Sequence, residues 1–254
     1  MIVVPGYNIV TDDLLFNMDS FYPPSYGGSG TVLTDSVKGL TADFSDADRE
    51  GWNIDNKPNG WSFDQTQNDT VVSPNSSDFE FQYNDSYSIE MWVNMRQQNS
   101  EYGYMINGRF TDASGVDYAG WGMMFDNGVL TGFVGGYPSN VLSWRRIETS
   151  SADWNTYVYN KWVQIVWSHD ATLANCKLYV NGVDRTNARN DQTSPPYTVN
   201  YDSNFKMGFA RDTFNWAFRL PMNGTISATR IYNKTLSSAE VNRNFNARRN
   251  YYGI

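Results

Sequence analysis

Six residues between positions 117 and 144 have side chains suited to sugar recognition. Aromatic rings can cover the apolar face of a sugar, while Asp and Asn side chains bond its hydroxyl groups and fix its orientation. The candidate glycan-binding residues are Asp117, Tyr118, Trp121, Asn127, Tyr137 and Trp144. In the alternative interpretation, Trp121 and Trp144 are core or interface residues, and the same ambiguity applies to Trp216 and Phe218.

Three aspartates in predicted loops are candidate ligands for calcium. This hard cation takes oxygen ligands from Asp and Asn side chains and from backbone carbonyl groups. The candidates are Asp117, Asp126, which is followed by Asn127, and Asp170. We expect no cofactor other than this candidate calcium ion.

Residues able to catalyse a reaction are scarce in this chain. His169 is the only histidine and Cys176 the only cysteine, which excludes a His-rich zinc site. A Ser-His-Asp or Cys-His mechanism would need His169 as its base, but this residue ends a predicted central strand, which favours a structural role. Glycoside hydrolysis needs two carboxylates about 5 to 10 Å apart. Only Asp78 and Glu80 pair a Glu with a carboxylate at strand spacing, and we interpret them as edge residues.

Composition narrows the classes of partner. The 27 acidic and 19 basic residues give a net charge of −8, so the average field repels nucleic acid. The sequence has no apolar run long enough to span a membrane. A lone cysteine cannot form an intramolecular disulfide, and no charged-then-apolar segment follows Met1. We therefore expect synthesis in a reducing cytoplasm without a signal peptide.

Strand-like alternation of apolar and polar residues runs through most of the chain, with Gly, Asn and Asp between the runs. Residues 162–167 are nearly all apolar, which suits a central strand covered on both faces, and Asn181-Gly182 predicts a two-residue hairpin turn. Ser237 and Glu240 form a capping-box pattern, which predicts one short C-terminal helix. Residues 1–30 and 137–160 are irregular. The pattern predicts an all-β sandwich or jelly roll of antiparallel sheets.

Four segments resemble, in order, the laminin-G-like branch of the concanavalin A-like lectin/glucanase superfamily. They are residues 87–94 (YSIEMWVN), 162–169 (WVQIVWSH) with 178–182 (LYVNG), 207–209 (MGF), and the closing strand and helix from Gly224 to Phe245. The resemblance implies a jelly-roll sandwich of two antiparallel sheets with a short C-terminal helix. It also implies a structural His169. The paired acidic motif of the superfamily's glucanases, Glu-x-Asp-x-Glu, is absent, so the sequence predicts a protein that is not an enzyme.

Residues 14–35 resemble the leader that precedes this domain in many virion proteins of tailed bacteriophages. The resemblance lies in residues 14–19 (LLFNMD), 22–26 (YPPSY), 28–31 (GSGT) and 34–35 (TD). Two positions depart from the pattern: Leu33 replaces a common Trp, and Ser227-Ala228 replaces a common acidic residue in the closing strand. The acidic residue's absence weakens the case for any charge-dependent role of that strand.

This second resemblance implies a function and a location. We expect a non-enzymatic bacteriophage virion protein, a capsid decoration or fibre protein on the virion surface. Its partners would be other virion proteins and a host-surface glycan, in a homo-oligomer or multicopy array assembled in the host cytoplasm. The alternatives are a lectin module outside a particle or, third, a glycan-cleaving enzyme with an atypical carboxylate pair.

The predicted organisation is an irregular N-terminal strap at residues 1–35, followed by the sandwich at residues 36–254. The strap either lies as an extended strand on its own domain or docks onto a neighbouring subunit. Truncation tolerance depends on how much buried backbone a segment supplies. We therefore expect that deleting residues 1–30 leaves a folded but partly destabilised sandwich.

Overall fold

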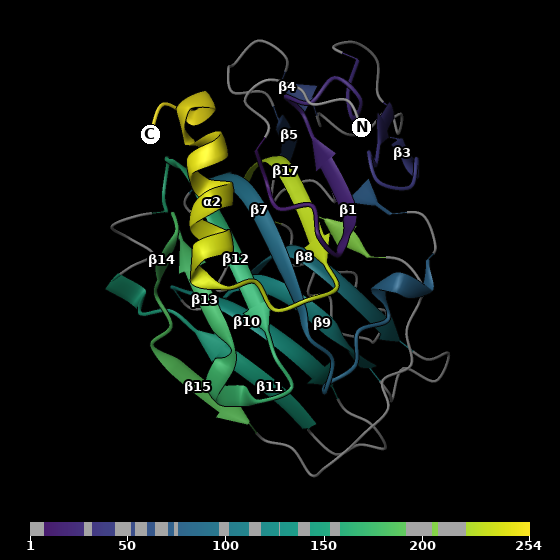
Figure 1. The fold of residues 1–254 in the computed structure, drawn as a ribbon. Helices are drawn as coiled ribbons and strands as arrows, with labels where there is room; N and C mark the ends of the chain where they lie inside the picture. Colours follow the sequence, from purple (N-terminus) through teal and green to yellow (C-terminus); the bar gives the residue numbers. More distant parts are fainter. Residues whose placement is uncertain are drawn as a thin grey trace.

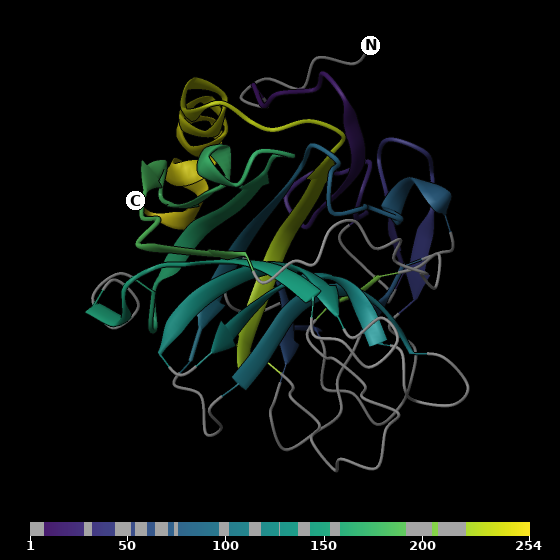
Figure 2. The same ribbon diagram turned by 90° about the horizontal axis from the view of Figure 1, so that it is seen from below.

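Two antiparallel sheets packed face to face form the body of the protein, and a short helix covers the outer side of one of them (Figure 1). Figure 2 shows the two sheets as separate layers. The computed structural model describes residues 8–27, 32–43, 52–53, 60–63, 71–73, 76–96, 102–111, 118–126, 128–136, 143–152, 158–191, 205–207 and 222–254. This architecture confirms the predicted all-β sandwich.

The sheet beneath the helix, called here the front sheet, has the strand order β14-β13-β12-β7-β17-β5-β4, and β1 also pairs with β17. β5 pairs with the start of β17 and β1 with its end. The strands are β14 Val183–Asp184, β13 Lys177–Val180, β12 Trp162–His169, β7 Tyr87–Met95, β17 Gly224–Tyr232, β5 Gly60–Phe63, β4 Trp52–Asn53 and β1 Leu14–Asp19.

The second sheet, called here the back sheet, has the order β15-β11-β10-β9-β8-β16-β6, and β2 and β3 form a separate hairpin. The back-sheet strands are β15 Ala188–Asp191, β11 Ser143–Glu148, β10 Val129–Gly136, β9 Tyr118–Asp126, β8 Tyr102–Thr111, β16 Lys206–Met207 and β6 Val71–Val72. The remaining elements are β2 Val32–Thr34, β3 Thr41–Asp43, α2 Ser238–Arg248 and the 3₁₀ turns η1 Ser77–Phe79, η3 Leu173–Asn175 and η4 Arg249–Tyr252.

Side-chain alternation in β7 shows why the central strands are buried on both faces. Ile89, Met91 and Val93 point into the core between the sheets, whereas Glu90 and Trp92 point outward beneath α2 and η4. Almost every residue of β7 and β12 is buried. The nearly continuous apolar run at 162–167 is therefore explained, as predicted, by a central strand with a cover on each side.

The helix α2 begins where the capping-box pattern predicted. The Ser237 side chain accepts a hydrogen bond from the backbone N–H of Glu240, and the Glu240 carboxylate accepts one from the Ser237 backbone N–H. These contacts satisfy two amide groups that the first turn of a helix leaves unpaired. Val241 is fully buried against the front sheet, so α2 is held by packing as well as by its cap.

The predicted hairpin turn at Asn181-Gly182 is also confirmed. Asn181 has φ 51° and Gly182 has φ +78°, the left-handed values that a type I′ turn requires at both central positions. The turn joins β13 to β14, with Val180 paired to Val183. It lies against α2, because an added Cβ at Gly182 would be 2.6 Å from Oδ1 of Asn242.

The described part of the predicted strap, residues 1–35, is joined to the sandwich through β1 and the β2–β3 hairpin. β1 is a strand of the front sheet, with Asn17 opposite Arg230 in β17. The β2–β3 hairpin crosses position 35, and the fully buried Asp35 carboxylate accepts the backbone N–H groups of Asn17, Val37 and Lys38. Between β1 and β2, the described residues 20–27 are turns or irregular, as expected from the Pro and Gly residues there.

Gly182→Val should destabilise the protein by about 1 kcal/mol or more, because a β-branched residue resists positive φ and its Cβ meets Asn242. Thermal melts would measure the change. Gly27→Ala is the matched control: an added Cβ at Gly27 has no atom within 4 Å, so its effect should stay within about 0.5 kcal/mol. Equal melting temperatures for both variants would contradict the turn assignment.

Candidate functional site

The structure places only part of the predicted glycan-binding set. Asp117, Asn127 and Tyr137 lie outside the described residues, as do Trp216 and Phe218. Tyr118 is the first residue of β9, but its side chain is outside the description. Trp121 and Trp144 are described, and they lie in different environments.

The interpretation of Trp121 as a surface platform is wrong. Its side chain is fully buried between the sheets, and its indole Nε1–H donates to the backbone carbonyl of Phe79 at 2.7 Å. A ring in this position cannot present a face to a sugar. It packs against Phe81 and Phe205, so the alternative assignment to the core is correct.

Trp144 is half-buried on β11, a strand that occupies part of the stretch predicted to be irregular. The guanidinium group of Arg146 lies 5.4 Å from the centre of the Trp144 ring. Arg146 also forms ion pairs with Asp126 and Glu148. Because Arg146 neutralises the Asp126 carboxylate, this aspartate is a poor candidate for a calcium ligand.

The Asp170 carboxylate stabilises the turn after β12. It accepts hydrogen bonds from the Thr172 backbone N–H at 2.8 Å, the Asn175 side chain and the Thr235 hydroxyl. Desolvation raises the pKa of Asp170, but these hydrogen bonds outweigh it and lower the pKa below 3.8. Within the described part of the chain, no three His, Cys, Asp or Glu residues gather to hold a metal ion. Asp117 lies outside that part.

His169 has the environment of a structural residue. Its ring is fully buried, stacks on Tyr87 and contacts the edge of Trp167. Nδ1 lies 2.9 Å from the Asp85 carbonyl oxygen, which can only accept, so this nitrogen carries the proton. Burial lowers the pKa of His169 from 6.5 to about 4, against the smaller opposing effect of that hydrogen bond. The neutral ring is therefore part of an aromatic cluster.

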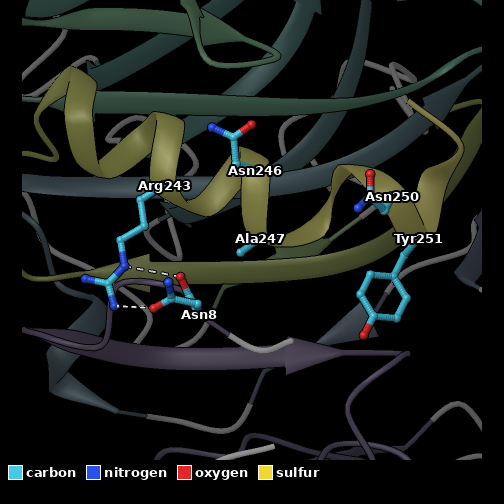
Figure 3. A pocket seen from close by; sticks show the side chains of 6 residues that line it. All are labelled: Asn8, Arg243, Asn246, Ala247, Asn250 and Tyr251. Carbon is cyan, nitrogen blue, oxygen red and sulfur yellow. Dashed lines mark hydrogen bonds between the residues drawn. The ribbon is translucent and has the colours of Figure 1, made fainter. Parts of the chain in front are cut away.

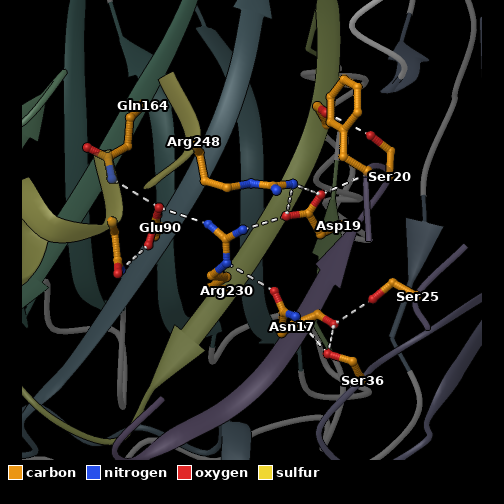
Figure 4. Close-up of polar contacts among 12 residues, drawn as sticks. Asn17, Asp19, Ser20, Ser25, Ser36, Glu90, Gln164, Arg230 and Arg248 are labelled. Carbon is orange, nitrogen blue, oxygen red and sulfur yellow. Dashed lines mark hydrogen bonds and ion pairs between the residues drawn. The ribbon is translucent and has the colours of Figure 1, made fainter. Parts of the chain in front are cut away.

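A chain of four buried charged side chains lies between the front sheet and α2 (Figure 4). Arg230 donates from Nη1 to Glu90 at 2.9 Å and from Nη2 to Asp19 at 2.5 Å, and Arg248 donates to Asp19 at 2.5 Å. All four side chains are at most 1% exposed. We call Glu90, Arg230, Asp19 and Arg248 the buried ion chain. It joins β7, β17, β1 and α2.

Neutral polar groups add further hydrogen bonds to the buried ion chain. Glu90 accepts from the Asn244 amide at 2.6 Å and the Gln164 amide at 3.0 Å, while Asn17 accepts from Nε of Arg230 at 3.0 Å. Buried charges persist only when paired and hydrogen-bonded in this way. The two carboxylates could suggest a glycosidase, but neither is accessible and Arg230 lies between them. This cluster therefore supports the fold.

Sequence reasoning missed the buried ion chain, although a signal was present. Glu90 is the only charged residue in the strand segment 87–93, and Arg230 is the only charged residue in the strand segment 226–232. A charged residue at an interior position of a strand covered on both faces must find a buried partner. The pattern alone does not identify that partner.

A surface pocket of about 710 Å³ lies along the exposed side of α2 and η4 (Figure 3). Its lining residues are Asn8, Arg243, Asn246, Ala247, Asn250 and Tyr251. Arg243 and Asn8 lie at one end of the pocket and Tyr251 at the other, with Ala247 between them. Arg243 donates to the Asn8 backbone carbonyl at 3.2 Å and to its side-chain oxygen at 2.8 Å.

Two buried residues attach this pocket to the front sheet. The Arg248 guanidinium lies 4.6 Å from the Tyr251 ring centre on one side and pairs with Asp19 on the other. Tyr252 stacks on Trp92 at 4.1 Å and donates its hydroxyl to Ser227 at 3.0 Å. The helix face that forms the pocket is therefore held from beneath.

The pocket lining can bind a polar ligand but supplies no acid–base pair. It offers amide and guanidinium groups for hydroxyl or anionic groups, and Tyr251, 45% exposed, for an apolar face. None of its six described residues is a carboxylate or a histidine. The sequence pattern does not predict this pocket, because five of its six lining residues are spaced along the exposed side of α2 and η4 and the sixth, Asn8, is distant in sequence.

The family model for the concanavalin A-like lectin/glucanases superfamily, of the laminin G type, matches residues 64–242. No curated protein matches the chain in sequence. Similar solved structures include the botulinum neurotoxin serotype D ligand-binding domain in complex with N-acetylneuraminic acid (14% identity, TM-score 0.65). Others are the binding domain of Paraclostridial mosquitocidal protein 1 (16%, 0.65) and Trypanosoma rangeli sialidase in complex with sialic acid (16%, 0.61).

Each of these three alignments covers 95% of this chain, but 54%, 55% and 34% of the respective relatives. The chain therefore spans about half the length of the two toxin domains and a third of the sialidase. At these identities, the likeness shows a shared fold.

Asp19→Asn should lower the free energy of unfolding by roughly 3–5 kcal/mol, because it removes the charge that neutralises both Arg230 and Arg248 in a buried site. Urea denaturation would measure the loss. Lys177→Gln is the control, since it breaks the partly exposed pair with Asp184 and should cost less than about 1 kcal/mol. Similar losses in both variants would contradict the structural role of the buried ion chain.

His169 should make stability fall as pH drops from 6.5 to 4. Its folded pKa, about 4, lies below the unfolded value of 6.5, so the unfolded state binds more protons in this window. The contribution lost by pH 4 is roughly 3 kcal/mol. Denaturant melts of wild type and His169→Gln across this range would measure the difference. A pH dependence that is the same in both proteins would show that His169 does not contribute it.

Proposed function

The chain belongs to the concanavalin A-like lectin/glucanase superfamily, and from this premise we propose that it is a non-enzymatic, glycan-binding protein of a bacteriophage virion. The observation that carries the binding role is the pocket on α2 and η4. Its amide, guanidinium and aromatic groups match the mixture that fixes a sugar. The glycan complexes and sialidase among the structures of similar fold add support.

The absence of catalysis is part of this proposal. A glycosidase needs two accessible carboxylates on either side of its substrate. Among the described residues, the two carboxylates of the buried ion chain are fully buried and paired with arginine. Asp78, one of the two acids at strand spacing in the sequence, pairs with Lys38 and accepts from Ser76. The carboxylates of these three residues already form ion pairs within the fold.

The virion role is supported by the leader at residues 14–35, which resembles that of tailed-phage virion proteins. Its β1 strand completes the front sheet, so the leader is integral to the domain in this chain. The partners would be other virion proteins, in a homo-oligomer or multicopy array, and a glycan on the host surface. A lectin module outside a particle is the second candidate, because the pocket would serve it equally well.

Three measurements test this proposal. A glycan array should show binding, a reducing-sugar assay on the bound glycans should show no release, and mass spectrometry should find the chain in purified phage particles. High copy number would place it on the capsid and low copy number on the tail or fibre. Absence from particles would favour the free lectin module, and sugar release would contradict the non-enzymatic role.

A further inference from the structure

The C-terminal segment carries positive charge on a protein that is otherwise acidic. Residues 241–254 contain Arg243, Arg248 and Arg249 and no Asp or Glu, whereas the whole chain has a net charge of −8. Two of these arginines lie outside the pocket. Arg248 is buried and paired with Asp19, and Arg249 packs over the Phe245 ring, 5.9 Å from its centre.

Arg243 is the cation that faces the pocket. It is exposed, and its interactions with described residues are the two hydrogen bonds to Asn8 (Figure 3). These use two of the five N–H donors of a guanidinium group, which leaves three for a ligand. No carboxylate within the described part of the chain pairs with it. The pocket thus contains a positive charge without a counter-charge from those residues.

We propose that this pocket selects sugars that carry a carboxylate, with Arg243 pairing the carboxylate and Tyr251 covering the sugar ring. The inference rests on the proposed glycan-binding function and names its ligand class. Arg243 and Tyr251 lie at opposite ends of the pocket, so the charged group and the apolar face of one ligand have separate contacts. Asn250, which lies beside Tyr251, supplies donors and acceptors for hydroxyl groups.

Electrostatics limit the ligand to one with few charges. The net charge of the protein repels polyanions at long range, and this field is screened beyond about 8 Å at physiological salt. A single carboxylate in direct contact with Arg243 gains the short-range attraction, and a planar guanidinium can bind it through two parallel hydrogen bonds. The helix dipole, which disfavours anions near a C-terminus, acts within the last turn, and Arg243 precedes that turn.

The binding free energy gained from one exposed ion pair, here between Arg243 and a sugar carboxylate, is modest. Such pairs contribute up to about 1 kcal/mol, which corresponds to about fivefold in affinity. The expected affinity for a single sugar is therefore weak, on the order of millimolar. Ligand-observed saturation-transfer NMR measures binding in this range.

The test compares N-acetylneuraminic acid and glucuronic acid with their methyl esters, which keep the sugar ring and remove the charge. At least one acid should bind about fivefold more tightly than its ester, and raising the salt concentration should reduce only the preference for the acid. Arg243→Gln should abolish that preference with an unchanged melting temperature, and Arg243→Lys should retain part of it. Arg249→Gln is the matched control, because Arg249 lies outside the pocket, and should leave the preference unchanged.

The outcomes separate this inference from the proposed function. Neutral glycans bound on an array, with no preference for either acid over its ester, would overturn the carboxylate assignment and leave glycan binding standing. A preference that survives Arg243→Gln would also overturn it, since the charge would be recognised elsewhere. No sugar bound at all would overturn both.

Discussion

The ion pairs that Asp19 forms with Arg230 and Arg248 are the interaction on which the rest of the structure depends. Removing each charge from water costs several kcal/mol, so two buried guanidinium groups require two buried carboxylates. Asp19 and Glu90 supply them, and the four side chains come from β1, β7, β17 and α2. A structure that lacks β1, β7 or β17 leaves these charges unbalanced, and one that lacks α2 loses both Arg248 and the cover over the chain. The leader, the central strands and the helix therefore form one unit.

This constraint connects the fold to the proposed binding surface. The front sheet alone would expose Trp92 and the ion chain to water, so α2 and η4 must cover them. The inner side of this cover is apolar and charged, with Val241, Arg248 and Tyr252 buried. Its outer side is free to carry Arg243 and Tyr251. Stability and recognition thus use opposite sides of the same segment, and substitutions on the outer side can change binding without disturbing the pairs beneath.

The sequence predicts those features that a few neighbouring residues determine. Asn181-Gly182 fixes its own turn, and Ser237 with Glu240 fixes its own helix start. The buried ion chain could not be assigned in this way, because its partners are 140, 211 and 229 residues apart in the sequence. The same limit explains the error about Trp121, whose burial depends on the opposite sheet. It also explains why the sequence could not name the strand that β1 pairs with, since β17 lies at the other end of the chain.

The most direct test of the proposed binding site is amide NMR mapping of the ¹⁵N-labelled protein during titration with an acidic sugar. This experiment locates the ligand without any substitution. The account predicts that the resonances of Asn8 and of residues 243–251 shift together and saturate with one affinity. Shifts confined to residues 117–144, the region that the sequence predicted, would contradict the site on α2 and place the binding site in that region instead.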